Sequence, residues 1–335
     1  MTKPRILLVA TGGTIASAED GNGLTPQLTG EQLAGYVPQA AELADIDIVQ
    51  PMNIDSTNMR PADWQAIGDA ILAQYEDYDG FVVLHGTDTM AYTAAALSYL
   101  IQDSPRPIVL TGSQQPMGSP FTDARINLYQ SVLYAADPDS HDVAVVFGGK
   151  VVAGTRARKQ RTMSFNAFTS VNYPELALIR NDRIIRTAPA GSGDARAASE
   201  PHVYHDLDER VFVLKLTPEI NPSVFELLRR DYDAIILETF GIGGIPDTLH
   251  DAIFGWVDSG RTLVVTTQVP EEGLDLGVYE VGRAYAEHPG ILKGADMTCE
   301  ALVAKTMWAL GQTREPERLR ELFYRPVNCD RLPEA

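Results

Sequence analysis

Short apolar runs alternate with stretches of helical periodicity through the first half of the chain. The run at 5–10 is apolar after Arg5 and the run at 81–84 is apolar throughout, which is typical of strands buried on both faces. At 61–75, apolar residues recur at helical spacing, and Pro61 suits a first helical turn. Further strands are expected at 107–112, 142–149 and 151–153, and further helices at 90–102 and 126–136. This alternation predicts βαβ units and a mostly parallel sheet.

A segment without periodicity interrupts this alternation. Residues 188–201 are rich in Ala, Gly, Ser and Pro, which is the composition of a linker. Beyond it, strands are expected at 211–216, 234–241 and 262–268, and helices at 222–230, 248–257 and 299–311. We therefore predict an N-terminal α/β domain at 1–190, a linker at 191–210 and a smaller C-terminal α/β domain at 211–335.

Composition excludes several classes of partner. The chain has 335 residues, with 27 Lys and Arg against 45 Asp and Glu, so its formal net charge is −18. This balance argues against nucleic acid and against an anionic membrane surface, both of which need clustered basic residues. No stretch approaches the ~18 apolar residues of a membrane span. Neither Cys299 nor Cys329 lies in a C-x-x-C pattern, which favours a reduced, intracellular compartment.

Three loops that follow expected strands carry hydroxyl groups beside glycines. They are residues 10–16 (ATGGTIA), 85–89 (HGTDT) and 111–115 (TGSQQ). In an open parallel sheet, ligands bind beyond the carboxyl ends of the strands, so these loops are expected to share one crevice. Glycine lets backbone N–H groups approach a ligand, and a hydroxyl is a potential nucleophile. Serine and threonine also commonly cap helices, so both interpretations stay open at this point.

The sequence lacks several common site motifs. It contains no G-x-G-x-x-G, no G-x-x-x-x-G-K-[ST], no G-x-S-x-G and no H-E-x-x-H. The six histidines do not cluster at metal-ligand spacing apart from His202 and His205, which lie in polar linker surroundings. A threonine nucleophile would then need another base, and lysine can serve. Lys159 follows a strand and Asp88 adjoins Thr87, but spacing alone favours a solvated surface lysine.

The segments ATGGTIA (10–16) and HGTDT (85–89) resemble the two signature segments of the bacterial-type L-asparaginase family. Similar segments occur at 55–59, 111–114, 157–159, 240–246 and 294–298, and the helix sequence MAYTAAALSYL indicates the cytosolic, type I branch. The resemblance implies a two-domain asparaginase-like α/β fold, with a larger N-terminal flavodoxin-like parallel-sheet domain and a smaller C-terminal α/β domain. It further implies hydrolysis of L-asparagine to L-aspartate and ammonia, without metal or cofactor. The expected assembly is a homodimer or homotetramer with sites near a subunit contact.

The same resemblance implies roles for individual residues. Thr14 matches the primary nucleophile of the family, and Thr87 matches its second catalytic threonine, with Asp88 and Lys159 as partners. Asp88 also matches the residue that receives the α-ammonium group of the substrate. The other positions assigned to substrate binding are Asp55, Ser56, Thr57, Gly86 and Ser113. Among these, the 55–57 loop is implied to hold the α-carboxylate, and Ser113 is implied to meet the side-chain amide.

The mobile loop after ATGGTIA departs from the family pattern. Relatives usually carry a tyrosine there that assists the first threonine, whereas residues 15–35 contain none, and Leu24 or a neighbour takes that place. The sequence therefore does not show which residue transfers the proton of Thr14. Tyr279 and Glu280 resemble a segment that places a glutamate, and in some relatives a tyrosine, near the site, so they are candidate accessory residues.

Several alternatives remain. One alternative is the asparaginase-like subunit of tRNA-dependent amidotransferases, which also carries HGTDT. Another is a non-catalytic amino-acid sensor, which would need the binding pocket but not the catalytic set Thr14, Thr87, Asp88 and Lys159. L-Glutamine is the rival substrate, because one methylene is worth only ~1–3 kcal/mol of discrimination. Some cytosolic members have an allosteric asparagine site with an arginine and a cysteine. The corresponding positions are Glu238 and Val269, which predicts no such cooperativity.

Overall fold

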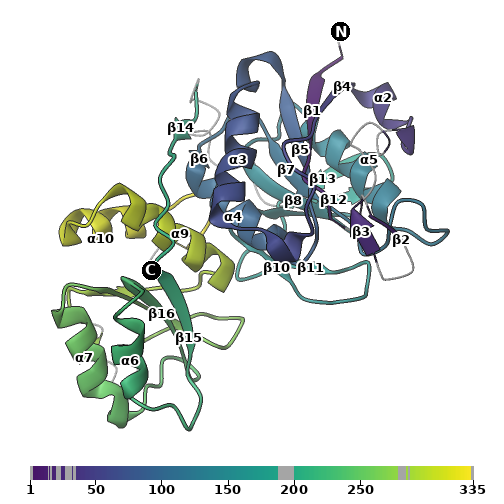
Figure 1. Cartoon of the computed structure of the whole chain (residues 1–335). Helices are drawn as coiled ribbons and strands as arrows, with labels where there is room; N and C mark the ends of the chain where they lie inside the picture. The colour runs from purple at the N-terminus through teal and green to yellow at the C-terminus, as the bar shows by residue number, and fades with distance from the viewer. Residues whose placement is uncertain are drawn as a thin grey trace. The chain divides into compact units, whose positions relative to one another are not determined.

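The computed structural model describes residues 3–13, 15, 17–19, 24–26, 32, 35–187, 200–277, 284–285 and 287–332, with backbone alone for 17–19 and 24–26. The chain divides into two compact units (Figure 1). The first comprises Met1–His205 with Val327–Cys329, and the second comprises Asp206–Pro326 with Asp330–Ala335. A segment from the C-terminal part of the sequence thus belongs to the first unit. The linker expected at 191–210 lies partly outside the described residues and stays a prediction.

An eight-stranded sheet runs through the first unit, in the order β13-β12-β9-β8-β7-β5-β1-β4. Five of its strands are parallel: β1 (Arg5–Ala10), β4 (Asp45–Val49), β5 (Gly80–Leu84), β7 (Ile108–Thr111) and β8 (Val143–Phe147). Numbered in chain order, they have the arrangement 2-1-3-4-5 of a flavodoxin-like sheet. The predicted α/β fold is therefore confirmed. The strand order reverses between β1 and β5, which is where such folds bind ligands.

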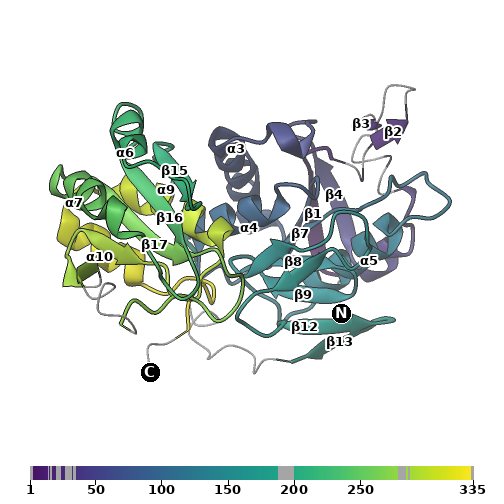
Figure 2. The ribbon, with the colours of Figure 1, turned by 90° about the horizontal axis from the view of Figure 1, so that it is seen from below.

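The remaining strands run antiparallel to their neighbours, so the sheet is mixed (Figure 2). They are β9 (Lys150–Ala153), β12 (Ala177–Arg180) and β13 (Arg183–Arg186). The direction of β9 follows from the turn before it. Gly148 and Gly149 have φ of +58° and +77°, and Phe147 pairs with Lys150 across this two-residue turn. Such a turn produces a hairpin, whereas a parallel connection needs a crossover of a dozen or more residues.

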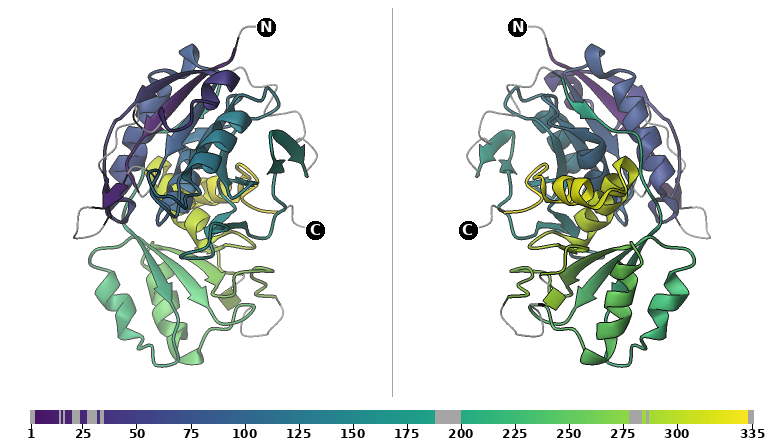
Figure 3. Two further views of the ribbon diagram at one scale, coloured as in Figure 1. Left: turned by 90° about the vertical axis from the view of Figure 1, so that its right-hand side faces the viewer. Right: turned by 90° about the vertical axis from the view of Figure 1, so that its left-hand side faces the viewer.

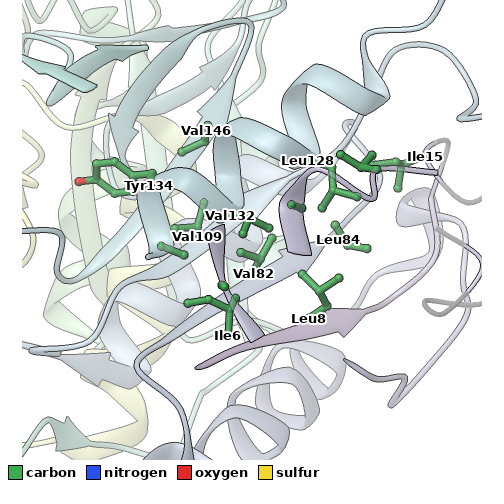
Figure 4. Close-up of a cluster of buried hydrophobic side chains, with 14 of the residues drawn as sticks. Ile6, Leu8, Ile15, Val82, Leu84, Val109, Leu128, Val132, Tyr134 and Val146 are labelled. Carbon is green, nitrogen blue, oxygen red and sulfur yellow. The ribbon is translucent and has the colours of Figure 1, made fainter. Parts of the chain in front are cut away.

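Helices cover both faces of this sheet. Ile6 and Leu8 of β1 point to one face, where Leu128 and Val132 of α5 pack against Val82 (Figure 4). The helices α3 and α4 contact β1, β7 and β8 on the other face. The predicted helices of this half are thus confirmed, with ends shifted by a few residues. The helices are α2 (Ala40–Leu43), α3 (Pro61–Leu72), α4 (Met90–Leu100) and α5 (Ala124–Ala135).

Short elements complete the first unit. Two are single 3-10 turns, η2 (Ser56–Asn58) and η3 (Tyr75–Asp77). The others are antiparallel pairs, namely β2 (Ser17–Glu19) with β3 (Leu24–Pro26), β6 (Ile101–Gln102) with β14 (His202–Val203), and β10 (Ala157–Lys159) with β11 (Phe168–Ser170). The β10–β11 pair matters for the site because Lys159 is the last residue of β10.

The second unit contains a parallel four-stranded sheet in the order β15-β16-β17-β18. Phe225 and Leu228 of α6 and Trp256 of α7 pack on one face of this sheet. The helix α9 contacts β15 and β16 on the other face. Figure 3 shows the ribbon from two opposite sides. The strands are β15 (Val211–Lys215), β16 (Ala234–Thr239), β17 (Thr262–Thr267) and β18 (Ile291–Lys293). The helices are α6 (Ser223–Leu228), η5 (Asp247–Leu249), α7 (His250–Asp258), α9 (Cys299–Gln312) and α10 (Pro316–Tyr324).

A buried ion pair fastens the C-terminal segment of the second unit to α9. Lys305 Nζ lies 2.5 Å from Asp330 Oδ2 and donates to Arg325 O at 2.7 Å. Both charged side chains are fully buried, and burial lowers the pKa of Lys305 to about 8. Removing one partner would leave an uncompensated buried charge, which typically costs about 3–5 kcal/mol.

Candidate active site

Loops from β1, β4 and β5 meet at the carboxyl edge of the sheet, where the strand order reverses. Gly13 N donates to Ile54 O at 3.1 Å, and Ile54 N donates to Thr11 O at 2.9 Å, which joins the loop after β1 to the segment after β4. The Thr89 hydroxyl donates to Ser56 O at 2.8 Å, which joins that segment to the loop after β5. The structure therefore joins the strand-end loops at 10–16 and 85–89, which the sequence placed at this edge, through the segment after β4, which only the family resemblance pointed to.

Glycines allow the closest approach between these loops. A Cβ on Gly13 would lie 2.3 Å from Cα of Gly86, and a Cβ on Gly86 would lie 2.4 Å from Ser56 Oγ. Gly13 also has a φ of +83°, which side chains rarely permit. The loop after β7 is equally close, because a Cβ on Gly112 would lie 2.2 Å from His85 O. These distances are far below van der Waals contact, so the arrangement requires glycine at each position.

Thr87, Asp88 and Lys159 form a hydrogen-bonded cluster beside these glycines. Lys159 Nζ donates to Thr87 Oγ1 at 2.7 Å and to Asp88 Oδ1 at 2.6 Å. Thr87 is 5% exposed, whereas the Asp88 side chain is 55% exposed. An ammonium group that donates to a hydroxyl oxygen stabilises negative charge developing there, and the carboxylate holds the ammonium group in place. Lys159 is therefore a partner of Thr87 rather than a solvated surface lysine.

Lys159 reaches this cluster from the β10–β11 pair. It lies opposite Phe168, which is 2% exposed. The Phe168 ring lies 5.0 Å from the ring of Phe147 at the end of β8, measured between centroids. The strand that carries the lysine is thus packed on the core of the large sheet, which limits where the ammonium group can lie.

Gln114 is a member of the cluster that the sequence patterns did not single out. Its Oε1 accepts from the Thr87 hydroxyl at 3.3 Å, and its Nε2 donates to Ser164 O at 3.2 Å. Thr87 therefore receives a hydrogen bond from Lys159 and gives one to Gln114. In the sequence, Gln114 belongs to the strand-end loop TGSQQ and to the family-like segment at 111–114, but neither pattern assigns it a role.

A buried carboxylate holds the loop that carries Gln114. Asp123 is 3% exposed and accepts from Gln114 N at 3.0 Å and from Gln115 N at 3.1 Å. Asn127 Nδ2 donates to Asp123 Oδ2 at 3.1 Å and to Gly112 O at 3.0 Å. No sequence motif indicates this role, because Asp123 and Asn127 match no pattern beyond the start of the helix α5.

His85 is a structural residue of the site. Its Nδ1 lies 2.7 Å from Gly86 O, and its Nε2 lies 2.9 Å from Thr93 Oγ1. Complete burial lowers the pKa of His85 to about 4, so the ring is neutral at pH 7. Nδ1 then donates to the carbonyl and Nε2 accepts from the hydroxyl. Both ring nitrogens of His85 are therefore used in holding the loop, which favours a structural role over a role as general base.

The residues expected to bind substrate lie near the cluster, with differing exposure. Asp55 Oδ1 accepts from Thr57 N at 2.9 Å and from Thr57 Oγ1 at 3.0 Å, and both residues are exposed. Ser56 is 3% exposed. Ser113 is fully buried, and its hydroxyl donates to Gln115 O at 2.6 Å. Thr14, Tyr279 and Glu280 lie outside the described residues, as does the side chain of Leu24.

The described part of the chain shows neither a cluster of metal ligands nor a membrane span. Within it, no three His, Cys, Asp or Glu side chains come together as ligands for a metal ion. His202 lies 3.1 Å from Asp103, whereas His205 lies 3.7 Å from Asp69, so the two histidines contact different carboxylates. Over the same ranges, no helix is long and apolar enough to cross a membrane.

The fold and the cluster define a class of enzyme. A buried hydroxyl in contact with an ammonium group can assist acyl transfer without a histidine. Glycine loops beside it offer backbone N–H groups of the kind that stabilise an oxyanion. A flavodoxin-like sheet with this cluster at its reversal point is therefore the architecture of a hydrolase that uses hydroxyl groups.

Known proteins match the chain over nearly its whole length. The family described as "Asparaginase, N-terminal" matches residues 5–190, and "Glutaminase/Asparaginase C-terminal domain" matches residues 210–323. The chain is 38% identical to L-asparaginase of Thermococcus kodakarensis, over 96% of this chain and 98% of that protein. It is 34% identical to L-asparaginase 1 of Escherichia coli strain K12, with both chains covered completely. It is also 36% identical to a subunit of the Glutamyl-tRNA(Gln) amidotransferase of Aeropyrum pernix, over 96% of this chain and 78% of that protein.

A solved structure shares the fold. The thermostable L-asparaginase from Thermococcus kodakarensis superposes with a TM-score of 0.88 at 36% identity, covering 98% of this chain and 100% of that chain. The chain belongs to the asparaginase family. The resemblance to the type I branch that the sequence shows is confirmed.

Proposed function

We propose that the protein is an L-asparaginase that hydrolyses L-asparagine to L-aspartate and ammonia. The observation that carries this proposal is the contact of the Lys159 ammonium group with Thr87 and Asp88 at the reversal point of the sheet. Identity of 38% and 34% to proteins named L-asparaginase supports the same activity. The proposed reaction uses no metal and no cofactor.

The proposed substrate site recognises the two charges of a free amino acid. The exposed carboxylate of Asp88 receives the α-ammonium group, and the 55–57 segment receives the α-carboxylate. Ser113 Oγ, which donates to Gln115 O, keeps acceptor lone pairs for the side-chain amide. The N–H of Gly86 adds a backbone donor. These contacts fix the scissile amide at a set distance from both charged ends.

The proposed reaction has two steps. Thr14 Oγ attacks the side-chain amide carbon, the carbon–nitrogen bond breaks, and ammonia leaves with the proton that the nucleophile gave up. Water then attacks the acyl-enzyme, which releases aspartate and restores the Thr14 hydroxyl. Thr87 and Lys159 move the protons, with Tyr279 and Glu280 as accessory candidates. In the rival route, water activated by Thr87 and Lys159 attacks the amide directly. Rapid-quench mass spectrometry separates the routes, because an acyl-enzyme on Thr14 belongs to the first alone.

Ammonia release tests the proposed function. Wild type and Thr14→Ala are compared on L-asparagine, L-glutamine and simple amides, with circular dichroism to confirm folding. Turnover of asparagine by wild type and its loss in Thr14→Ala are expected. Retained turnover in a folded Thr14→Ala protein would refute the assigned nucleophile. Binding of asparagine without ammonia release would favour an amino-acid sensor instead.

A second candidate function rests on one comparison. The chain is 36% identical to an amidotransferase subunit that acts on glutamyl-tRNA, according to its name. Co-purification with a partner protein and tRNA-dependent ammonia release would favour this function. Turnover of free asparagine by the purified chain alone would favour the asparaginase.

Three further properties belong to the proposal. The substrate is L-asparagine, with L-glutamine as the rival, and the panel above gives their ratio. The assembly is a homodimer or homotetramer, which light scattering of the purified protein tests. The location is the cytoplasm, which suits a chain whose Cys299 and Cys329 are both thiols, and cell fractionation tests it.

A further inference from the structure

The turn before the lysine-bearing strand packs against residues from the C-terminal part of the sequence. Thr155 Oγ1 donates to Asn328 O at 2.6 Å, and Arg156 Nε donates to Cys329 O at 2.5 Å. Thr155 and Arg156 are both fully buried. Asn328 and Cys329 belong to the same compact unit as this turn, although 173 residues separate each bonded pair. We call Asn328 and Cys329 the C-terminal clasp.

The side chain of Asn328 holds the clasp to the core of the first unit. Its Nδ2 donates to Ser98 Oγ at 2.9 Å and to Val143 O at 2.8 Å. Ser98 lies in α4, and Val143 is the first residue of β8. Asn328 has a φ of +45°, a conformation that asparagine adopts more readily than most residues. One residue therefore ties the turn to a helix and to a core strand.

Arg156 carries the contact on to the second strand of the β10–β11 pair. Its carbonyl accepts from Val171 N at 3.0 Å, and its Nη1 donates to Val171 O at 3.5 Å. The guanidinium carbon lies 5.5 Å from the centroid of the Tyr173 ring. The clasp thus contacts an arginine that joins both strands at the base of the pair, with Lys159 at the other end of β10.

We propose that the C-terminal clasp positions Lys159 for the reaction, with Thr155 and Asn328 as positioning residues. The lysine side chain has a flexible four-carbon stem, so its ammonium group is placed by the strand that carries it as well as by Thr87 and Asp88. A misplacement of about 1 Å can cost about 10² in rate. The expected effect on turnover rests on the proposed function, whereas the effect on the placement of Lys159 does not.

Point variants test this role without removing the whole segment. Thr155→Val keeps the size of the side chain and removes the hydroxyl that donates to Asn328 O, and Thr155→Ser restores that hydroxyl. Asn328→Gly removes the side chain at a φ that glycine accepts. Thr239→Val is the matched control, because Thr239 is fully buried in the second unit and its hydroxyl donates to Thr266 O at 2.7 Å.

Two measurements are made on each folded variant. The first is the acetylation rate of each lysine by acetic anhydride, read by mass spectrometry. The chain has few lysines, so exposed Lys215 reports reagent activity and fully buried Lys305 reports global unfolding. The second is kcat and KM for ammonia release from L-asparagine.

In Thr155→Val and Asn328→Gly, acetic anhydride is expected to acetylate Lys159 several-fold faster than in wild type. The acetylation rates of Lys215 and Lys305 should not change. We expect kcat to fall roughly 10-fold or more while KM changes little. Thr155→Ser and Thr239→Val should keep the wild-type rates. Wild-type labelling and turnover in both Thr155→Val and Asn328→Gly would overturn the proposal, as would faster labelling of Lys305 together with Lys159. If wild type releases no ammonia but Lys159 is still acetylated faster in Thr155→Val, the positioning role stands and the proposed function fails.

Discussion

Replacing Lys159 with methionine separates the chemical role of its amine from its contribution to stability. Methionine keeps the apolar stem, but Thr87 Oγ1 and Asp88 Oδ1 each lose a donor. The Asp88 side chain is 55% exposed, and an ion pair at such a site is worth about 0–1 kcal/mol. The hydrogen bond to Thr87 adds about 0.5–1.5 kcal/mol. The free energy of unfolding should therefore fall by about 0.5–2.5 kcal/mol, and the variant should fold.

The activity of Lys159→Met should fall much further. A positioned proton-transfer group contributes about 10²–10⁴ in rate, which is about 2.7–5.5 kcal/mol of the activation barrier. Ammonia release from L-asparagine is measured beside urea unfolding on the same preparation. Lys215→Met is the control, because Lys215 is an exposed lysine of the second unit. Turnover by folded Lys159→Met within about 10-fold of wild type would refute the reasoning, because the amine would then contribute too little for proton transfer.

Three other predictions concern the pKa of His85, the packing around Gly86 and the dependence of the rate on asparagine concentration. Because burial holds the pKa of His85 at about 4, below its ordinary 6.5, the unfolded state binds this proton more tightly. Stability should therefore fall by up to ~3 kcal/mol as the pH drops from about 6.5 through about 4, and urea unfolding of His85→Gln should lack this slope. Gly86→Ala should lower both Tm and asparagine turnover, because its Cβ would lie 2.4 Å from Ser56 Oγ; wild-type values for both would contradict the close packing. With Glu238 and Val269 at the positions matched to the allosteric site, the rate should rise hyperbolically with asparagine, and a sigmoidal curve would disprove this.

The parts of the fold that the sequence predicts well are those with strong local patterns. The strand expected at 5–10 is β1, and its apolar residues after Arg5 are all buried. By contrast, β4 (Asp45–Val49) escapes prediction because it lies at the sheet edge and alternates apolar residues with Asp45 and Asp47. The antiparallel course of β9 depends on the turn at 148–149, where two glycines adopt positive φ. That Gly-Gly pair is a hairpin signal, and the expectation of a continuing parallel series overlooked it.

The site is harder to predict than the strands, because its contacts join residues that are far apart in the sequence. Spacing alone left Lys159 as a surface lysine, and only the family resemblance suggested that it meets Thr87. Their contact joins residues 72 positions apart in the sequence. The patterns that include Gln114 assign it no role, and the buried Asp123 that holds its loop lies in no pattern at all. Such supports become visible only when the loops are placed side by side.

The order of synthesis gives the C-terminal clasp a further consequence. A nascent chain can assemble the large sheet while the ribosome is still adding the second unit, since domains tend to fold as they emerge. The contact of Asn328 with Thr155 must wait until residue 328 has left the exit tunnel. The first unit is therefore finished by a piece that is translated after nearly all of the second. A tag or deletion introduced close to residue 328 should consequently disturb the N-terminal half of the protein, far away along the gene.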